Sequence, residues 1–284
     1  MPLRDTAVGH RLDTITAHCD ARWLMAYAAG VPDERAELYA TDADLCMHPL
    51  FPVAPEWQLL AGNRSLPHGM TPEEAKRGIH IGHDLVLARR VRPGESITVQ
   101  AHIAAVARRA FGATQETMFV ATGDDGDTVW RTRFTSLFLG VELEGDPSTE
   151  AIDWPPLSES LPTADPLASR PSFVRTIDAH VYSECARIWN PIHTDVTAAR
   201  RAGLAAPILH GTATLARAIS IVTELADVPL AAVCRVACQF DSMVTPGSAL
   251  HIRLLAANEN VLGFDVMDER GRCAVSSGTI HHQS

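Results

Sequence analysis

The chain has few basic and aromatic residues, and it lacks long apolar runs and paired cysteines. It carries 24 Lys and Arg against 34 Asp and Glu, a formal net charge of −10. This balance argues against nucleic acid as a partner, because a phosphate backbone binds clustered cations. No apolar run approaches the roughly 20 residues that a membrane span needs, and the first residues lack the apolar core of a secretory signal. We therefore expect a cytoplasmic protein with neither a nucleic-acid nor a membrane partner.

The six cysteines are scattered along the chain and contain no Cys-x-x-Cys pair. Reduced thiols are typical of such a pattern in a cytoplasmic protein. The Cys and His residues are not grouped at the spacing of zinc ligands. The sequence therefore predicts no metal site and no redox cofactor.

A length of 284 residues is long for one core, since domains usually contain about 100–200 residues. Residues 145–171 hold six prolines and almost no periodicity, which is typical of a linker. We predict a first domain over residues 1–144 and a second over 172–284.

The two halves show a similar order of elements. Each Pro-Gly pair, Pro93-Gly94 and Pro246-Gly247, predicts a type II turn that feeds a long strand. The run 210–227 is apolar nearly all round, so we expect a buried helix. The repeat favours a duplicated α+β fold in which two curved antiparallel sheets each wrap around a central helix and join side by side. The predicted helices are 20–30, 178–187, 194–202 and 210–227, and the predicted strands are 78–91, 95–110, 113–123, 127–139, 231–240, 249–257, 260–268 and 272–281.

The most informative stretch reads YSECARIWNPIHTDVTAARRAGLAAPILHG, residues 182–211. Asn190-Pro191-Ile192-His193 forms a polar elbow, and His210-Gly211 follows seventeen residues after His193. An imidazole titrates near neutrality and serves as acid and base in turn. If a helix begins at Gly211–Thr212, its free N–H groups point at an incoming oxygen. This combination suits chemistry next to a carbonyl group.

These residues resemble the motif of (R)-specific enoyl-CoA hydratases and MaoC-like dehydratases, which have the hot-dog fold. The family pattern is roughly Tyr, a spacer, Gly-Asp-x-Asn-Pro-Leu-His, then Ala-Gly, then Pro-Ile-x-His-Gly. The matching residues here are Tyr182, Asn190, Pro191, Ile192, His193, Ala202, Gly203, Pro207, Ile208, His210 and Gly211. The Pro-Gly strand at 246–253 resembles a further family segment, and residues 47–53 and 78–97 resemble the first half of two-domain members.

The resemblance implies a double hot-dog lyase of fatty acid metabolism that hydrates a 2-enoyl thioester or dehydrates a 3-hydroxyacyl thioester. It implies His193 as the acid/base, Gly211 as the carbonyl-binding N–H, and Asn190 as the residue that positions water or the histidine loop. The substrate is an acyl-CoA or acyl-carrier-protein thioester, with coenzyme A present only as part of the substrate. The degenerate first half makes room for a bulky acyl chain. Both a monomer and a homodimer fit this architecture, and we favour the homodimer.

One position departs from the family pattern. The family places its catalytic Asp two residues before the Asn, and here that position is Ile188. Losing one member of an acid–base pair costs about 10²–10⁴ in rate. Candidates for a replacement acid are Glu184 and Asp195, and the histidines His48, His80 and His83 of the first half are alternatives.

Four further residues are candidates for substrate binding. Pro207 and Thr212 flank the His210-Gly211 pair, and His210 is expected to anchor the loop before the helix. Trp189 is either a core residue or a wall of the acyl pocket.

Ile188 leaves two other functions open. One is a non-catalytic acyl-thioester binder, or a subunit whose partner supplies the missing acid. The other is a thioesterase, which we rank last because residues 204–223 contain no Asp or Glu to direct water at the start of the helix.

Overall fold

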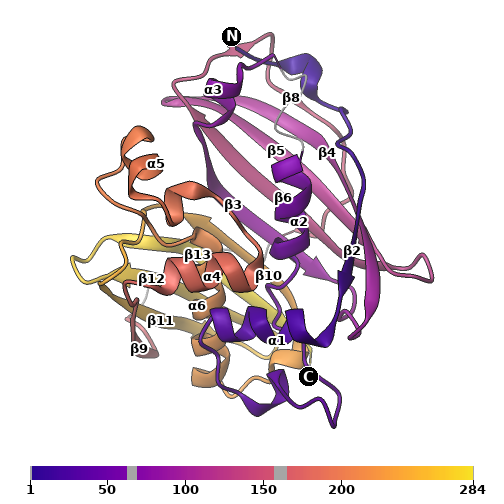
Figure 1. Ribbon diagram of the computed structural model, residues 1–284, viewed down its shortest axis with the longest axis vertical. Helices are drawn as coiled ribbons and strands as arrows, with labels where there is room; N and C mark the ends of the chain where they lie inside the picture. Colours follow the sequence, from indigo (N-terminus) through magenta and orange to yellow (C-terminus); the bar gives the residue numbers. More distant parts are fainter. Residues whose placement is uncertain (1, 63–68, 157–164, 284) are drawn as a thin grey trace.

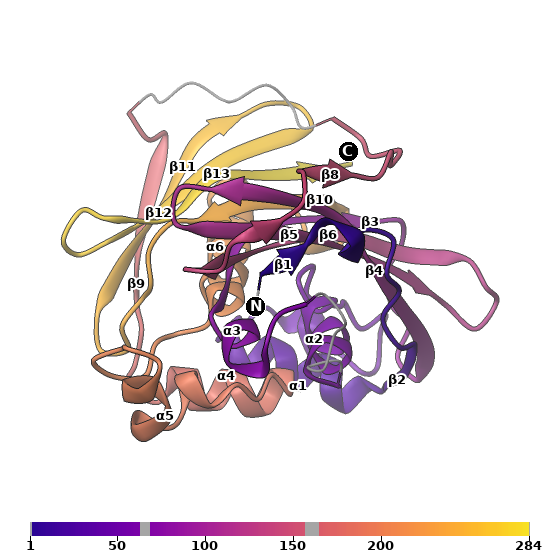
Figure 2. The same ribbon diagram turned by 90° about the horizontal axis from the view of Figure 1, so that it is seen from above.

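One sheet of eleven strands runs through both halves of the molecule, and its helices lie on one side (Figures 1 and 2). The computed structural model describes residues 2–62, 69–156 and 165–283. The strand order is β2-β4-β5-β6-β3-β10-β13-β12-β11-β9, with β8 pairing beside β4. The two halves meet where β3 pairs antiparallel with β10.

The first half follows the order strand, helices, four strands, and the second half repeats it. The elements of the first half are β2 (Ile15–Cys19), α1 (Ala21–Gly30), α2 (Val53–Gly62), α3 (Pro72–Ala75), β3 (Gly78–Leu87), β4 (Glu95–Arg109), β5 (Gly112–Thr122) and β6 (Thr128–Leu139). Those of the second are β9 (Ala168–Phe173), α4 (Asp178–Ala186), α5 (Val196–Arg201), α6 (Gly211–Leu225), β10 (Val233–Phe240), β11 (Ala249–Ala257), β12 (Val261–Asp268) and β13 (Cys273–His282). Short strands β1 (Leu3–Arg4) and β7 (Leu143–Glu144) pair in parallel, and β8 (Ser148–Thr149) pairs with β4.

The predicted α+β double fold is confirmed, and most predicted elements agree with the structure to within a few residues. Helix α6 is buried along most of its length, as its apolar sequence predicts. Helix α2, the corresponding helix of the first half, was not predicted as a helix. Gly94 and Gly247 have φ of +88° and +89°, so both Pro-Gly pairs have the positive φ that a type II turn requires at its third residue.

Two strands lie inside the stretch 145–171 that the sequence suggests is a linker. Strand β8 joins the edge of the first half, and β9 begins at Ala168 and pairs with β11. Residues 157–164 of the predicted linker lie outside the described residues.

Helices α1 and α4 pack closely and tie the two halves together on the helical side of the sheet. A Cβ atom on Gly30 would lie 2.7 Å from the Cβ of Cys185, so only glycine allows this approach. The hydroxyls of Tyr27 and Tyr182, both fully buried, lie 3.1 Å apart. Tyr27 donates to the Leu50 carbonyl, and Tyr182 donates to the Thr212 hydroxyl at the start of α6. The start of α6 is therefore braced by both helices.

The other face of the sheet carries a buried ion pair at the seam between β3 and β10. Arg235 donates to both carboxylate oxygens of Asp84 at 2.8 and 2.7 Å. The same guanidinium donates to the carbonyls of Pro155 and Pro156, and the Trp154 indole donates to Asp84 at 2.8 Å. The pair thus joins β3, β10 and the connecting segment at one point.

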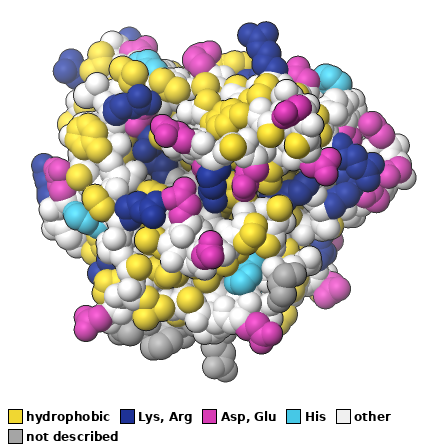
Figure 3. All heavy atoms as spheres, turned by 90° about the horizontal axis from the view of Figure 1, so that it is seen from below, with side chains coloured by type: hydrophobic (Ala, Val, Ile, Leu, Met, Phe, Trp, Pro, Cys, Tyr) yellow, Lys and Arg dark blue, Asp and Glu magenta, His cyan; other side chains and the backbone are white. Residues whose placement is uncertain are grey.

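The exposed surface is of mixed charge. On the face drawn in Figure 3, Lys and Arg side chains alternate with Asp and Glu and form no large field of one sign over the described atoms. In the described part of the chain, no helix is long and apolar enough to cross a membrane.

We expect Arg235→Met to destabilise the protein by about 3–5 kcal/mol, because it leaves the Asp84 charge buried without its partner. Urea denaturation followed by far-ultraviolet circular dichroism measures the free energy of unfolding. The matched control is Arg253→Met, which breaks the more exposed Arg253–Asp265 pair and should cost about 0–1 kcal/mol. Equal effects of the two substitutions would contradict a special role for the seam pair.

Candidate functional site

The candidate site lies between the end of α4 and the start of α6. Helix α4 ends in a left-handed residue, Arg187, with φ of 58°, so the chain turns sharply toward Asn190. The N–H of Ile188 then donates to the Ser183 carbonyl, a helix-ending bond. The family pattern has glycine at this position, and an L side chain there costs about 1 kcal/mol or more. The Arg187 guanidinium lies 4.1 Å from the centre of the Trp23 ring, a contact that offsets part of this cost.

His193 is buried with one ring nitrogen fixed. It ends the short 3₁₀ helix η3 (Pro191–His193) and is 8% exposed. Its Nδ1 lies 2.8 Å from the Ile208 carbonyl. A carbonyl can only accept, so Nδ1 carries the proton and Nε2 holds the free lone pair. Burial lowers the pKa of His193 to about 4, although the Ile208 bond acts in the opposite direction. At neutral pH the side chain is therefore a neutral base.

His210 stacks on His193 and holds the loop before α6, as predicted. The two rings lie 3.6 Å apart at 24°. The Nε2 of His210 lies 3.3 Å from both the Ile188 carbonyl and the Ser183 hydroxyl. The Ser183 hydroxyl donates to Ala179, so Nε2–H of His210 is the donor toward Ser183. Burial, followed by the neighbouring His193, lowers the pKa of His210 well below its ordinary value. The stacked pair is thus uncharged.

Helix α6 begins with N–H groups that have no acceptor in the described residues. The His210 carbonyl accepts from Ala213 and Thr214, and His210 provides no side-chain cap. The N–H groups of Gly211 and Thr212 are therefore available to an oxygen at the positive end of the helix dipole. A Cβ on Gly211 would lie 3.1 Å from the Phe240 ring. The absence of a side chain at Gly211 therefore leaves room for an oxygen to reach these N–H groups.

Ile188 fills the position where the family pattern has its acid. Its side chain is 4% exposed and contributes no polar atom. The structure does not bring either replacement acid to His193. Asp195 is the N-cap of α5 and accepts from Thr197 and Ala198, and Glu184 is exposed on α4. Neither carboxylate makes a hydrogen bond or ion pair with His193 in the described residues.

The first-half histidines divide into two kinds. His48 is fully buried and structural: its Nδ1 accepts from Leu50 and its Nε2 pairs with Ser220 of α6. His80 and His83 lie on β3 with ring centres 5.4 Å apart. His80 also lies 4.7 Å from the Phe240 ring, and neither histidine makes a hydrogen bond with His193 in the described residues.

The remaining predicted residues lie around the same loop. Asn190 precedes η3, and its carbonyl accepts from the His193 N–H. Pro207 is half-buried before the loop that ends in His210, and Thr212 is held by Tyr182. Trp189 is 55% exposed, so its interpretation as a core residue is wrong. Ser183 and Phe240 complete the site but have no signal in the sequence, because their roles depend on chain folding. Ile208 belongs to the matched motif, but the bond of its carbonyl to His193 follows only from the folded structure.

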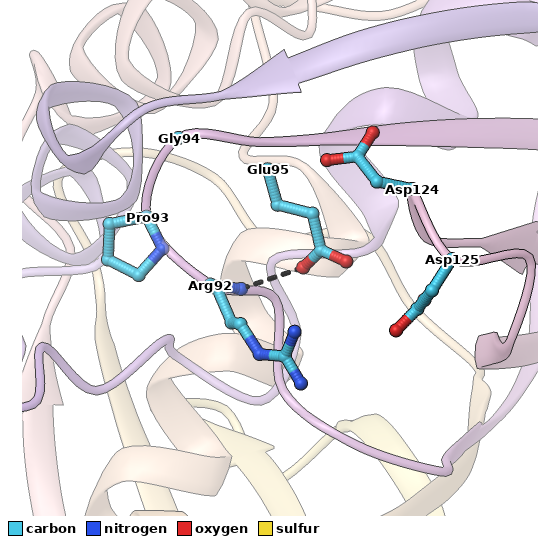
Figure 4. Close-up of a pocket in the computed structure, with 6 residues that line it drawn as sticks. All are labelled: Arg92, Pro93, Gly94, Glu95, Asp124 and Asp125. Carbon is cyan, nitrogen blue, oxygen red and sulfur yellow. Dashed lines mark hydrogen bonds between the residues drawn. The ribbon is translucent and has the colours of Figure 1, made fainter.

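A separate surface pocket has a different character (Figure 4). It lies where the turn before β4 meets the turn between β5 and β6, and two of its carboxylates accept hydrogen bonds from neighbouring residues. Glu95 accepts from Arg89 and from the Arg92 N–H, and Asp124 accepts from the Ser96 N–H. None of the candidate site residues lines it. Within the described residues, no cluster of three or more His, Cys, Asp or Glu side chains is arranged to hold a metal ion.

Comparison with known proteins supports the fold and the second-half motif. Residues 158–275 match the sequence profile of the MaoC like domain. No curated protein sequence matches the chain significantly. A MaoC-like dehydratase from Phytophthora capsici superposes with a TM-score of 0.84 at 19% identity, covering 99% of this chain and 98% of that one.

Two further structures are similar. The peroxisomal multifunctional enzyme type 2 from Drosophila melanogaster gives a TM-score of 0.80 at 21% identity over 96% of this chain, which spans only 48% of that one. A Mycobacterium tuberculosis protein with a double hotdog fold gives 0.63 at 12% identity, covering 96% and 95% of the two chains. At these identities the likeness establishes the double hot-dog fold.

We expect the imidazole of His193 to stay neutral, with its proton on Nδ1, down to about pH 4, the pKa that burial gives it. Because this value lies below the ordinary 6.5, the unfolded chain binds the proton more tightly. The His193 contribution to stability is therefore present above pH 6.5 and is lost as the pH falls toward 4. Long-range ¹H–¹⁵N spectra between pH 8 and 4 report both nitrogens, and His193→Gln identifies the signals. A midpoint near 6.5 would contradict this description.

Proposed function

We propose that this chain, whose residues 158–275 carry a MaoC-like domain, catalyses the reversible hydration of a 2-enoyl thioester. The observation that carries the proposal is the position of His193. Its Nδ1 is fixed by Ile208, its ring is stacked on the residue before Gly211, and its Nε2 lone pair is free. Structural relatives that bear the name dehydratase support the same reaction class.

In the hydration direction, the thioester carbonyl accepts from the N–H groups of Gly211 and Thr212. Nε2 of His193 removes a proton from water as the water oxygen bonds to C3 of the enoyl group. The electron pair of the C2–C3 double bond moves toward the carbonyl and forms an enolate, which the helix N–H groups stabilise. The protonated His193 then returns its proton to C2, which restores the carbonyl and the neutral imidazole.

The absence of a carboxylate makes this cycle depend on one imidazole. His193 is a weak base while the site is empty, since burial disfavours its cationic form. A developing enolate places a negative charge beside the imidazolium, which favours the cation at the moment when it forms. The acyl thioester thus supplies the counter-charge that Ile188 does not.

The burial of Ile188 also favours a second candidate function. An apolar side chain in the acid position suits a protein that binds acyl thioesters without hydrating them, or one whose partner supplies the acid. For both candidate functions we propose a homodimer and a thioester of coenzyme A or of an acyl carrier protein as the ligand. An assay of the loss of 2-enoyl-CoA absorbance distinguishes the two functions.

We expect the wild-type protein to remove the ultraviolet absorbance of 2-enoyl-CoA, and His193→Ala to lower kcat/KM by about 10²–10⁴. His251→Ala, an exposed histidine on β11, is the control and should retain full activity. The acidic limb of the kcat/KM profile should have an apparent pKa near 4, the value for His193 in the free protein. A thiol reagent in the same assay detects thioester hydrolysis. Unchanged absorbance at high protein concentration across short and long chains would refute the hydratase.

We expect Ile188→Asp to raise kcat/KM, because it restores a carboxylate at the position of the family acid. The gain should be at most about 10²–10⁴, the range for one acid–base group. Ile188→Asn is the matched control, since it has similar size and polarity but cannot ionise. If both variants behave alike, or if Asp lowers the rate while the protein remains folded, the carboxylate is not what the site lacks.

A further inference from the structure

The inner face of the first half carries buried polar groups that have no partner in the described residues. They are Oε2 of Glu56, both ring nitrogens of His83 and Oε1 of Gln115. These side chains are 2%, 3% and 5% exposed. A buried polar atom without a hydrogen bond costs about 1–3 kcal/mol, and such atoms are rare in native structures. Three such residues on one inner face indicate a surface that binds a polar group of a ligand.

The strand register places two of these residues and several other polar side chains next to one another. His83 on β3 is opposite Phe134 on β6, and Phe134 is opposite Thr117 on β5. One row further along the strands, His80, Ser136 and Gln115 are opposite one another in the same way. The Gln115 amide donates to Thr117 at 3.1 Å.

Glu56 joins this patch from helix α2. Its Oε1 accepts from the Trp130 indole and from the hydroxyl of Thr132, the neighbour of Phe134 on the same face of β6. Burial raises the pKa of Glu56 to about 8 and lowers that of His83 to about 4. At neutral pH both groups are uncharged, so the patch offers hydrogen bonds without a net charge. Such a surface suits a hydroxyl or keto group rather than a carboxylate.

The patch adjoins the candidate site through Phe240. The His80 ring stacks on Phe134 at 3.7 Å and lies 4.7 Å from Phe240. Phe240 in turn lies beside Gly211. Phe240, His80 and His83 thus form a continuous series of neighbours from Gly211 to the patch. Because His80, Phe134 and Phe240 are only partly buried, this is the route that a chain held at Gly211 would follow.

We infer that the first half holds a polar subsite, built from His83, Gln115 and Glu56, that binds a hydroxyl group on the distal part of the acyl chain. This inference rests on the proposed function, because it takes an acyl thioester at Gly211 as the occupant. It goes beyond that function in assigning a substrate class: oxygenated acyl thioesters rather than plain ones.

Binding of saturated thioesters tests the subsite apart from catalysis, since these compounds cannot be hydrated. Isothermal titration calorimetry compares hexanoyl-CoA with 5-hydroxyhexanoyl-CoA, and octanoyl-CoA with 7-hydroxyoctanoyl-CoA. We expect the wild-type protein to bind at least one hydroxy compound about tenfold more tightly than its plain partner, the effect of one well-formed hydrogen bond. A hydroxyl can accept from the ring N–H of His83 and donate to Oε1 of Gln115, so His83→Leu and Gln115→Leu should each lose most of that preference and keep their affinity for the plain chains.

A stability measurement separates a ligand-binding role from a structural one. His83→Leu removes nitrogens that have no partner, so its Tm should rise. His48→Leu is the matched control: His48 is equally buried but bonded at both nitrogens, so the same substitution should lower Tm. If His83→Leu does not fold, Gln115→Leu alone tests the binding preference, and an unchanged preference in that variant refutes the inference.

Equal or weaker binding of both hydroxy compounds by the wild-type protein would overturn the subsite, as would a preference that survives both leucine substitutions. Failure to bind any of the four thioesters would overturn the subsite and the proposed function together. A clear preference for the hydroxy compounds in a protein that hydrates no 2-enoyl-CoA, plain or oxygenated, would remove the proposed reaction and leave the subsite standing.

Discussion

The pairing of β3 with β10 is the constraint on which the rest of the structure depends. It joins two hot-dog units into one sheet and places the inner face of the first half next to the start of α6. The buried Asp84–Arg235 pair fixes this seam on the opposite face, where it also holds the connecting segment at Pro155 and Pro156. Without this register, His80 would not lie against Phe240.

The two stacked histidines of the candidate site carry no charge. His193 and His210 are both neutral because burial lowers the pKa of each, and Ile188 lies where the resembled pattern has its acid. A carboxylate beside them would favour the imidazolium form and would require its own hydrogen bonds. Next to these neutral rings, the N–H groups at the start of α6 supply a fixed positive potential. In the proposed function, this potential acts on the oxygen of the thioester carbonyl.

Local sequence signals predicted much of the fold and part of the site. The apolar run of α6, the Pro-Gly turns and the alternating strands each have a direct physical cause in their own residues. Asp195 shows the limit of these signals. It precedes a helical run, so its role as an N-cap could be predicted from the sequence. Its charge and its closeness to His193 in the chain instead suggested a replacement acid. Helix α2 was missed, and its Pro55 lies within the first turn, where proline is tolerated. Contacts such as Arg235 with Asp84, 151 residues apart, follow only from the register of the sheet.

The two halves have kept one architecture and diverged in their central helices. Helix α6 begins at Gly211 with free N–H groups and is lined by the stacked histidines. Helix α2 instead presents Glu56, a buried carboxylic acid with one oxygen bonded to β6 and the other without a partner in the described residues. Retaining such a group in a fold that does not need it is costly. Under the proposed function, the two helices divide the labour: the second half acts on the thioester, and the first half recognises the remainder of the chain.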